Sequence, residues 1–112
     1  MRMWMVKPKF LCRKHLLGEH GELHKHRPSF IKKHSMTGRI HPIVLIQIAS
    51  MKKRHDELAE EMLRRGYNHK SPYEQPDTSY LPIEEQNAKV DLQYNLKDLS
   101  ERCEECRNRI NG

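Results

Sequence analysis

The chain has 112 residues, of which 36% are hydrophobic, so we expect one small folded unit with a lean hydrophobic core. Its three cysteines are too few for the disulfide framework of a small secreted protein, which favours a reducing cytoplasm. No run approaches the ~18 apolar residues of a membrane-spanning helix, and Lys7, Pro8 and Lys9 end the first apolar segment far short of a signal peptide.

The formal net charge of +6 is unevenly distributed along the chain. Residues 1–40 contain ten Lys and Arg against two Glu, whereas residues 41–112 contain eleven Lys and Arg against thirteen Asp and Glu. A basic part beside a nearly neutral remainder is typical of proteins that bind a polyanion. Ribosomal or membrane-surface binding would fit the same asymmetry, so charge alone leaves the partner open.

An arm of residues 1–7 precedes the first predicted helix, which extends from about Pro8 to about His34. Pro8 suits the first turn, where its missing N–H is not needed, and Arg27-Pro28 predicts a kink or a break. Apolar residues at helical spacing form a stripe that we expect to be buried. They are Cys12, Leu16, Leu23 and Phe30.

A second face of this helix combines a carboxylate, a glycine and positive charge. Its residues are His15, Gly18, Glu22 and Lys25. Gly18 and Gly21 each cost ~1 kcal/mol relative to Ala, so we expect a close approach there by another backbone or a ligand. Glu22 therefore points away from the core beside a glycine gap. On this pattern alone, a solvated acid that contacts Lys25 is the simpler interpretation.

A connection at residues 35–42 leads to a second predicted helix at residues 43–65, which Gly66 should end. The apolar stripe of that helix has six members: Leu45, Ile48, Met51, His55, Leu58 and Met62. Residues 67–81 are predicted to form an ordered loop. A third helix at residues 83–110 follows, with a continuous apolar stripe from Leu92. The pattern predicts an all-α, compact single domain of three main helices without a sheet.

Two groups of residues suggest a metal site, and each also has a simpler interpretation. Cys103 and Cys106 are spaced like a pair of zinc ligands, and Cys12 with a histidine would complete four. Both, however, lie on the apolar stripe of the third helix, where Cys packs as a small hydrophobe. His20 and His24 lie four residues apart, but the sequence between them differs from the HExxH of zinc proteases. We interpret these two as a packing residue and a phosphate contact, and we predict no metal and no cofactor.

Four segments stand in an order that resembles a known family. They are Arg2, LCRKHLLGEHGELHK at 11–25, KRHDELAEEMLRRGYNHK at 53–70 and SYLP at 79–82. The most specific parts are the HLxxExxEL core of the first helix and the ELxxExxxRGYN end of the second. Together they resemble the pyrimidine-dimer DNA glycosylase/AP lyase family, the phage-type UV-repair endonuclease V.

The resemblance implies an all-helical enzyme whose nucleophile is the α-amino group of its first residue, with the arm tucked near the active site. By position, the catalytic amine falls on Met1 and the assisting glutamate on Glu22. Because an initiator methionine is trimmed only before small residues, Arg2 favours the retention of Met1. We expect DNA contacts from one set of basic residues. They are Arg2, Arg13, Lys14, His15, Lys25, Lys32 and Lys33.

We therefore predict a DNA-repair N-glycosylase with AP-lyase activity, acting without a cofactor on double-stranded DNA that carries pyrimidine dimers, related damaged bases or abasic sites. We expect a monomer in the cytoplasm, associated with the nucleoid as in a phage or bacterial protein, with no membrane partner. One alternative is a glycosylase or AP lyase for another lesion on the same scaffold. Others are a DNA-binding protein that keeps the fold without the chemistry, and a small zinc-stabilised module.

Overall fold

The computed structural model describes residues 2–69 and 71–112, which form six α-helices and no strand. Two single 3-10 turns, η1 (Pro8–Phe10) and η2 (Ile48–Ser50), precede the first two long helices. The α-helices are α1 (Arg13–Ile31), α2 (Thr37–Ile40), α3 (Met51–Arg64), α4 (Ile83–Gln86), α5 (Leu92–Arg102) and α6 (Glu104–Asn111). The all-α prediction is confirmed, and none of the described helices is long and apolar enough to cross a bilayer.

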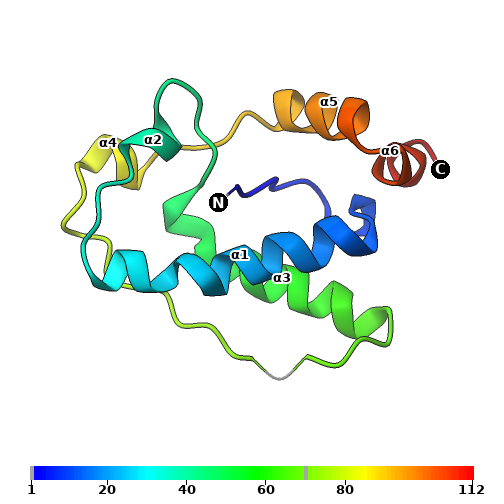
Figure 1. The fold of residues 1–112 in the computed structure, drawn as a ribbon, viewed down its shortest axis with the longest axis horizontal. Helices are drawn as coiled ribbons and strands as arrows, with labels where there is room; N and C mark the ends of the chain where they lie inside the picture. The colour runs from blue at the N-terminus through cyan, green and yellow to red at the C-terminus, as the bar shows by residue number, and fades with distance from the viewer. Residues whose placement is uncertain (1, 70) are drawn as a thin grey trace.

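The core lies where α1 packs against α3. The arm lies beside α1, and α5 and α6 cover the arm on its opposite side (Figure 1). Leu16, Leu23 and Phe30 of α1 are at most 1% exposed, and Cys12 just before the helix is 4% exposed, so the predicted stripe is confirmed. The predicted stripe of the second helix is also buried from Ile48 onward. Each fully buried side chain of this size contributes about 1.5–3 kcal/mol.

The N-terminal arm lies between α1 and α5 and is held there through its backbone (Figure 1). The Met3 N–H donates to the Leu45 carbonyl at 2.8 Å, and the Asn95 side-chain amide donates to the Trp4 carbonyl at 3.0 Å. Arg54 donates to the Val6 carbonyl at 2.7 Å. Trp4 is only 6% exposed, so it anchors the arm in the core. The arm is therefore tied to three separate segments of the fold.

The first helix is shorter than predicted at its start and unbroken in its interior. The chain forms η1 after Lys7 and then extends at Leu11 and Cys12, so α1 begins at Arg13 and not at Pro8. It continues through Pro28 and ends at Ile31. The end is set by Lys33, whose φ of 59° is left-handed, and by the His34 N–H, which donates to the Ser29 carbonyl in a Schellman-like closure. The break that the sequence allowed at Arg27-Pro28 therefore does not occur.

The second predicted helix begins later than expected, and the third is divided into three shorter helices. Residues 43–47 are not helical. The Leu45 carbonyl accepts from the arm, the Leu45 N–H donates to the Arg39 carbonyl, and α3 begins only at Met51. The β-branched residues Ile43, Val44 and Ile46 are less suited to a helix interior. The predicted helix at 83–110 is divided into α4, α5 and α6. Asp91 caps α5 by accepting from the Tyr94 N–H, and Cys103 is extended between α5 and α6.

Candidate active-site groove

An open groove of about 500 Å³ lies between the arm, the first half of α1 and the segment that precedes α3. It brings the predicted glutamate, the arm and several cations together. Its lining residues are Arg2, Trp4, Lys14, His15, Gly18, Glu19, Glu22, Arg39 and Leu45. The volume falls within the ~300–1,000 Å³ range of sites that hold small ligands.

Glu22 stands on the groove side of α1 with a half-exposed side chain. Its side chain is 38% exposed, and its Oε2 lies 2.8 Å from Nε2 of His26, one turn further along the helix. One turn earlier, Gly18 leaves the helix surface open, and no described atom lies within 4 Å of a Cβ placed there. No described backbone therefore fills the gap at Gly18, which supports the ligand alternative of the sequence analysis. The His26 partner was missed, although its i, i+4 spacing from Glu22 was visible.

A buried ion pair supports the groove from beneath. Arg54 of α3 donates from Nε and Nη2 to the two carboxylate oxygens of Glu19, at 2.5 and 2.9 Å. Both side chains are at most 2% exposed. Sequence reasoning missed this pair, although Glu19 lies three residues after Leu16 on the buried side of its helix. The pair fixes α3 and, through Val6, the arm against the floor of the groove.

Arg2 is held in the groove wall by α5. Its Nη2 donates to Oδ1 of Asn95 at 2.9 Å, its Nη1 lies 2.7 Å from Asp98, and its guanidinium lies 3.9 Å from the centre of the Trp4 ring. Its buried Nε has no hydrogen-bond partner among the described residues. Arg2 is thus a fixed positive charge in the wall of the groove.

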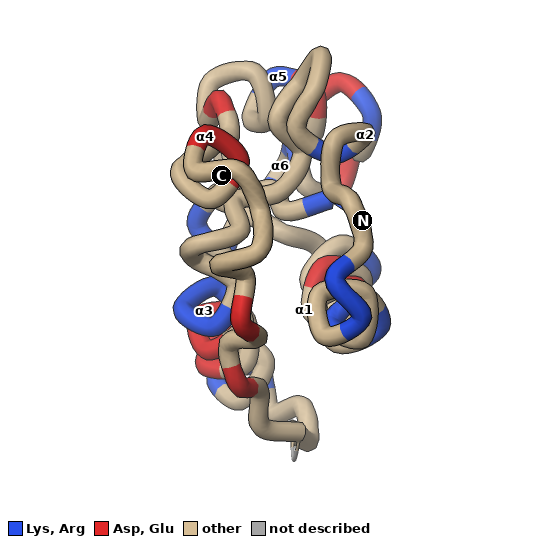
Figure 2. Tube along the Cα trace, turned by 90° about the vertical axis from the view of Figure 1, so that its left-hand side faces the viewer, with Lys and Arg blue, Asp and Glu red and all other residues tan. Residues whose placement is uncertain are grey.

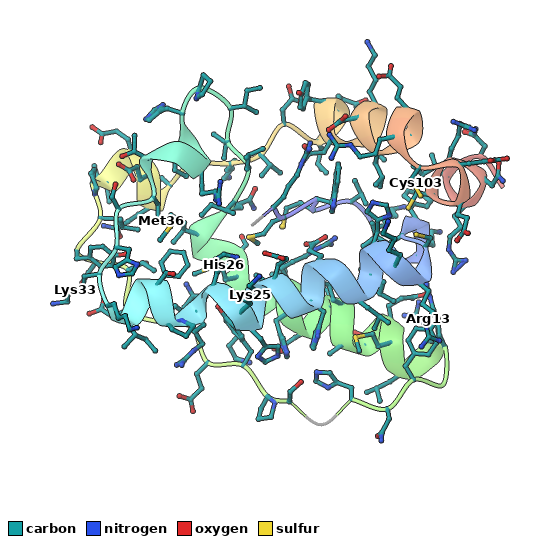
Figure 3. All side chains as sticks on the ribbon, viewed as in Figure 1. Arg13, Lys25, His26, Lys33, Met36 and Cys103 are labelled. Carbon is teal, nitrogen blue, oxygen red and sulfur yellow. The ribbon has the colours of Figure 1, made fainter. Side chains whose placement is uncertain are left out.

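The predicted DNA-binding residues do not all reach the groove. Arg2, Lys14 and His15 line it, whereas Lys25 is exposed on α1 outside its lining. Arg13 and Lys33 lie at opposite ends of α1, with Lys25 between them (Figure 3). The remaining cation, Lys32, is exposed beside Lys33, and Arg13 lies over the Tyr67 ring at 4.8 Å. Met1, the predicted nucleophile, lies outside the described residues.

The charge of α1 is mostly positive, whereas that of α3 is mixed. Figure 2 shows Lys and Arg along α1, and both Lys and Arg and Asp and Glu on α3. Arg39 adds a positive charge to the groove that sequence reasoning missed, because its segment looked like a plain connection. Burial, followed by the charges of Lys14 and Arg102, lowers the pKa of His15. His15 is therefore a neutral imidazole near pH 7 and not an additional cation.

Two groups of His and Cys side chains also come together in the fold. Cys12, His15, Cys103 and Cys106 meet where the start of α1 touches α6. A second group joins α1, α3 and the loop after α3, and its members are His20, His24, His55 and His69. The first group is the ligand set named by the zinc alternative of the sequence analysis.

The family model for pyrimidine dimer DNA glycosylases matches residues 1–75 of the chain. This match covers more than half of the chain and includes the arm, α1, α3 and all nine residues that line the groove, so the chain belongs to this family of DNA-repair glycosylases. Its substrate class is accordingly DNA that carries damaged bases. Searches among curated proteins and among solved structures found no match. The SYLP segment and the helices α5 and α6 lie beyond the matched region.

Proposed function

We propose that the protein excises the damaged base of a pyrimidine dimer and then nicks the DNA strand at the resulting site, with the α-amine of Met1 as nucleophile. The single observation that carries this proposal is the position of Glu22 in a groove that Arg2 also lines. Met1 is bonded to Arg2, and consecutive Cα atoms are only about 3.8 Å apart. The proposed nucleophile therefore belongs to the residue next to one that lines the groove with Glu22.

The amine is chemically suited to this role at neutral pH. An α-amine with a pKa near 7.7–8.0 is roughly a tenth to a fifth neutral at pH 7, whereas a lysine near 10.4 is neutral in fewer than about one in a thousand molecules. The terminal α-amine is thus the most available amine nucleophile of this chain.

The proposed reaction begins with attack of the amine nitrogen on the sugar C1′ of the 5′ pyrimidine nucleotide. The N–C1′ bond forms while the glycosidic bond breaks, and the amine loses its protons as the sugar opens to an imine. Removal of a C2′ proton then expels the 3′ phosphate by β-elimination. Glu22 stabilises the cationic sugar, accepts a proton from the attacking amine and passes it to the ring oxygen as the sugar opens, while the departing base takes a proton from water. The carboxylate is then free to accept the C2′ proton, and His26 holds it in place.

The groove and the cations on α1 support binding of a distorted duplex. Phosphate contacts from basic side chains position the DNA without reading its sequence. A groove of about 500 Å³ accommodates an extruded nucleotide, which an enzyme acting on a base within a duplex must expose. Gly18 lets the sugar approach the α1 backbone closely.

The test is a Glu22→Gln variant, which keeps the shape of the side chain and removes its charge. Strand nicking of a dimer-containing duplex should fall by about two to four powers of ten, the usual range for a lost acid–base group. Glu84→Gln, on exposed α4 outside the groove lining, is the matched control and should nick like the parent. If Glu22→Gln is as active as the parent, the proposal is contradicted and Glu22 is only a solvated surface acid. Activity on abasic sites alone would favour an AP lyase for another lesion.

A further inference from the structure

The ends of the chain meet in a cluster of three thiols and one imidazole. Sγ of Cys12 lies 3.9 Å from Sγ of Cys103, although 91 positions separate them in the sequence. Nδ1 of His15 lies 3.2 Å from Sγ of Cys12 and 3.5 Å from Sγ of Cys106. All four ligand atoms lie within 4.8 Å of one another. We propose that these four residues bind a structural zinc ion.

The distances fit a tetrahedral ion better than the alternatives. Zn–S bonds of about 2.3 Å and Zn–N bonds of about 2.0–2.1 Å place tetrahedral ligand atoms about 3.5–3.8 Å apart. The three pairs described above lie 3.2–3.9 Å apart, and all pairs lie within 4.8 Å. A disulfide needs sulfur atoms about 2.0 Å apart and would leave a third cysteine over. Apolar packing explains the burial of Cys12 and Cys106 but not an imidazole nitrogen directed at both of their sulfurs.

The backbone around the cysteines is arranged for this ligand set. The Cys12 N–H donates to Sγ of Cys106 at 3.2 Å, the type of outer hydrogen bond that stabilises a metal thiolate. Cys12 caps the start of α1 and Cys103 separates α5 from α6, and both have extended backbones. The break at Cys103, which the sequence pattern did not predict, thus places its side chain opposite Cys12 (Figure 3).

The ion would fasten α6 to the first turn of α1, next to the groove. Four protein ligands leave no open position, which is the arrangement of a structural and not a catalytic zinc site. Cys103 and Cys106 lie beyond the part of the chain that matches the family model. Cys12 and His15 lie within the matched residues, so the ion would join the matched part of the chain to the C-terminal helices, and His15 also lines the groove.

Cobalt provides a direct test on the untagged full chain. Co²⁺ added to the metal-free protein should bind with the intense thiolate-to-cobalt charge-transfer absorption of a three-sulfur site, and Zn²⁺ should displace it. A Cys106→Ser variant should lose this absorption. Because that variant could fail to fold, alkylation of the three thiols in the unchanged chain is measured with Zn²⁺ and with a chelator. Protection by Zn²⁺ supports the site. Absence of the charge-transfer band, or equal alkylation under both conditions, would overturn it.

A second cluster carries an independent inference. Nε2 of His20 lies 3.1 Å from Nε2 of His55 and 2.9 Å from Nε2 of His69, and Nε2 of His24 lies 3.0 Å from Nε2 of His55. The four nitrogen atoms converge within 4.8 Å from α1, α3 and the loop after α3. We infer that these histidines bind a second zinc ion, since imidazole nitrogen is a favoured zinc ligand.

Hydrogen bonds between the rings cannot account for all of these contacts. Nε2 of His55 lies within 3.1 Å of three polar atoms, which are Nε2 of His20, Nε2 of His24 and the carbonyl oxygen of Ser71. A ring nitrogen has either one proton or one lone pair, so this atom cannot form a hydrogen bond with all three. Nε2 of His20 likewise faces both His55 and His69, and Nδ1 of His55 lies 2.9 Å from Oδ1 of Asp56. A central cation satisfies all four nitrogen lone pairs at once. The His55–Asp56 contact is also the carboxylate–histidine pair that orients zinc ligands.

Metal stoichiometry separates the two sites. Elemental analysis of the unchanged chain should give two zinc ions per chain. His69→Ala should reduce this to one and leave the thiolate-to-cobalt absorption unchanged, whereas His34→Ala, an exposed histidine after α1, should keep two. One zinc per unchanged chain together with the full thiolate absorption would overturn the histidine site. So would a His69→Ala variant that retains two ions. Because the readouts are metal content and absorption, failure here does not depend on the proposed glycosylase activity.

Discussion

The buried pair of Arg54 and Glu19 allows a quantitative test of how the arm and α3 are held on α1. Arg54→Met keeps the length of the side chain and removes three hydrogen bonds, two to Glu19 and one to the Val6 carbonyl. The Glu19 carboxylate is fully buried and would lose its partner. Breaking such a pair costs about 3–5 kcal/mol. At about 4 °C per kcal/mol for a chain of this size, the melting temperature should fall by about 12–20 °C.

Urea unfolding followed by far-UV circular dichroism measures this loss, and two further variants locate its origin. The double variant Glu19→Leu with Arg54→Met removes both charges and should recover most of the stability, because no unpaired buried charge remains. Lys53→Met changes the exposed neighbour on α3 and should stay within about 0.5 kcal/mol of the parent. A loss below about 1 kcal/mol in Arg54→Met, or a double variant as unstable as the single one, would refute the reasoning.

Three other outcomes follow from the arm, the groove and the charge of α1. Asn95→Leu removes the donor to the Trp4 carbonyl and the acceptor of Arg2, so urea unfolding should show a loss of about 1–3 kcal/mol. Gly18→Ala should raise the free energy of unfolding by up to ~1 kcal/mol, because nothing described obstructs the methyl group. The same variant should nick DNA more slowly, and unchanged nicking would contradict a close approach of the sugar at Gly18. With four to six phosphate contacts, a plot of the logarithm of the DNA association constant against the logarithm of the salt concentration should have a slope of roughly −4 to −5. A slope near zero would exclude binding through phosphate contacts.

Local patterns in the sequence predicted the helices wherever the core alone determines them. The spacing of Leu16, Leu23 and Phe30 fixes the buried side of α1, and the interior of α3 follows the same rule. The pattern failed at residues 43–47, where the Leu45 carbonyl accepts from the arm, more than forty residues away. That failure comes from a partner that is distant in sequence. The pattern failed again at Cys103, whose extended backbone separates α5 from α6.

The sequence predicted those parts of the groove that lie on one helix, but not those that the fold brings together. Helical geometry placed Glu22 and Gly18 on one face, which depends only on nearby residues. Arg39 was missed because only the fold brings its segment to α1. The same holds for the proposed histidine ligands. The i, i+4 spacing of His20 and His24 can be seen in the sequence. That His55 and His69 meet this pair is a property of the packing of α1, α3 and the loop.

The most direct test of the proposed chemistry is borohydride trapping on duplex DNA that carries an abasic site, run beside a dimer-containing duplex. The imine between the amine and the sugar should be reduced to a stable protein–DNA adduct, and peptide mapping should place that adduct on the α-amine of Met1. Glu22→Gln should form far less of it in the same time. No adduct on either substrate, or an adduct mapped to a lysine side chain, would contradict the proposal that the terminal amine is the nucleophile.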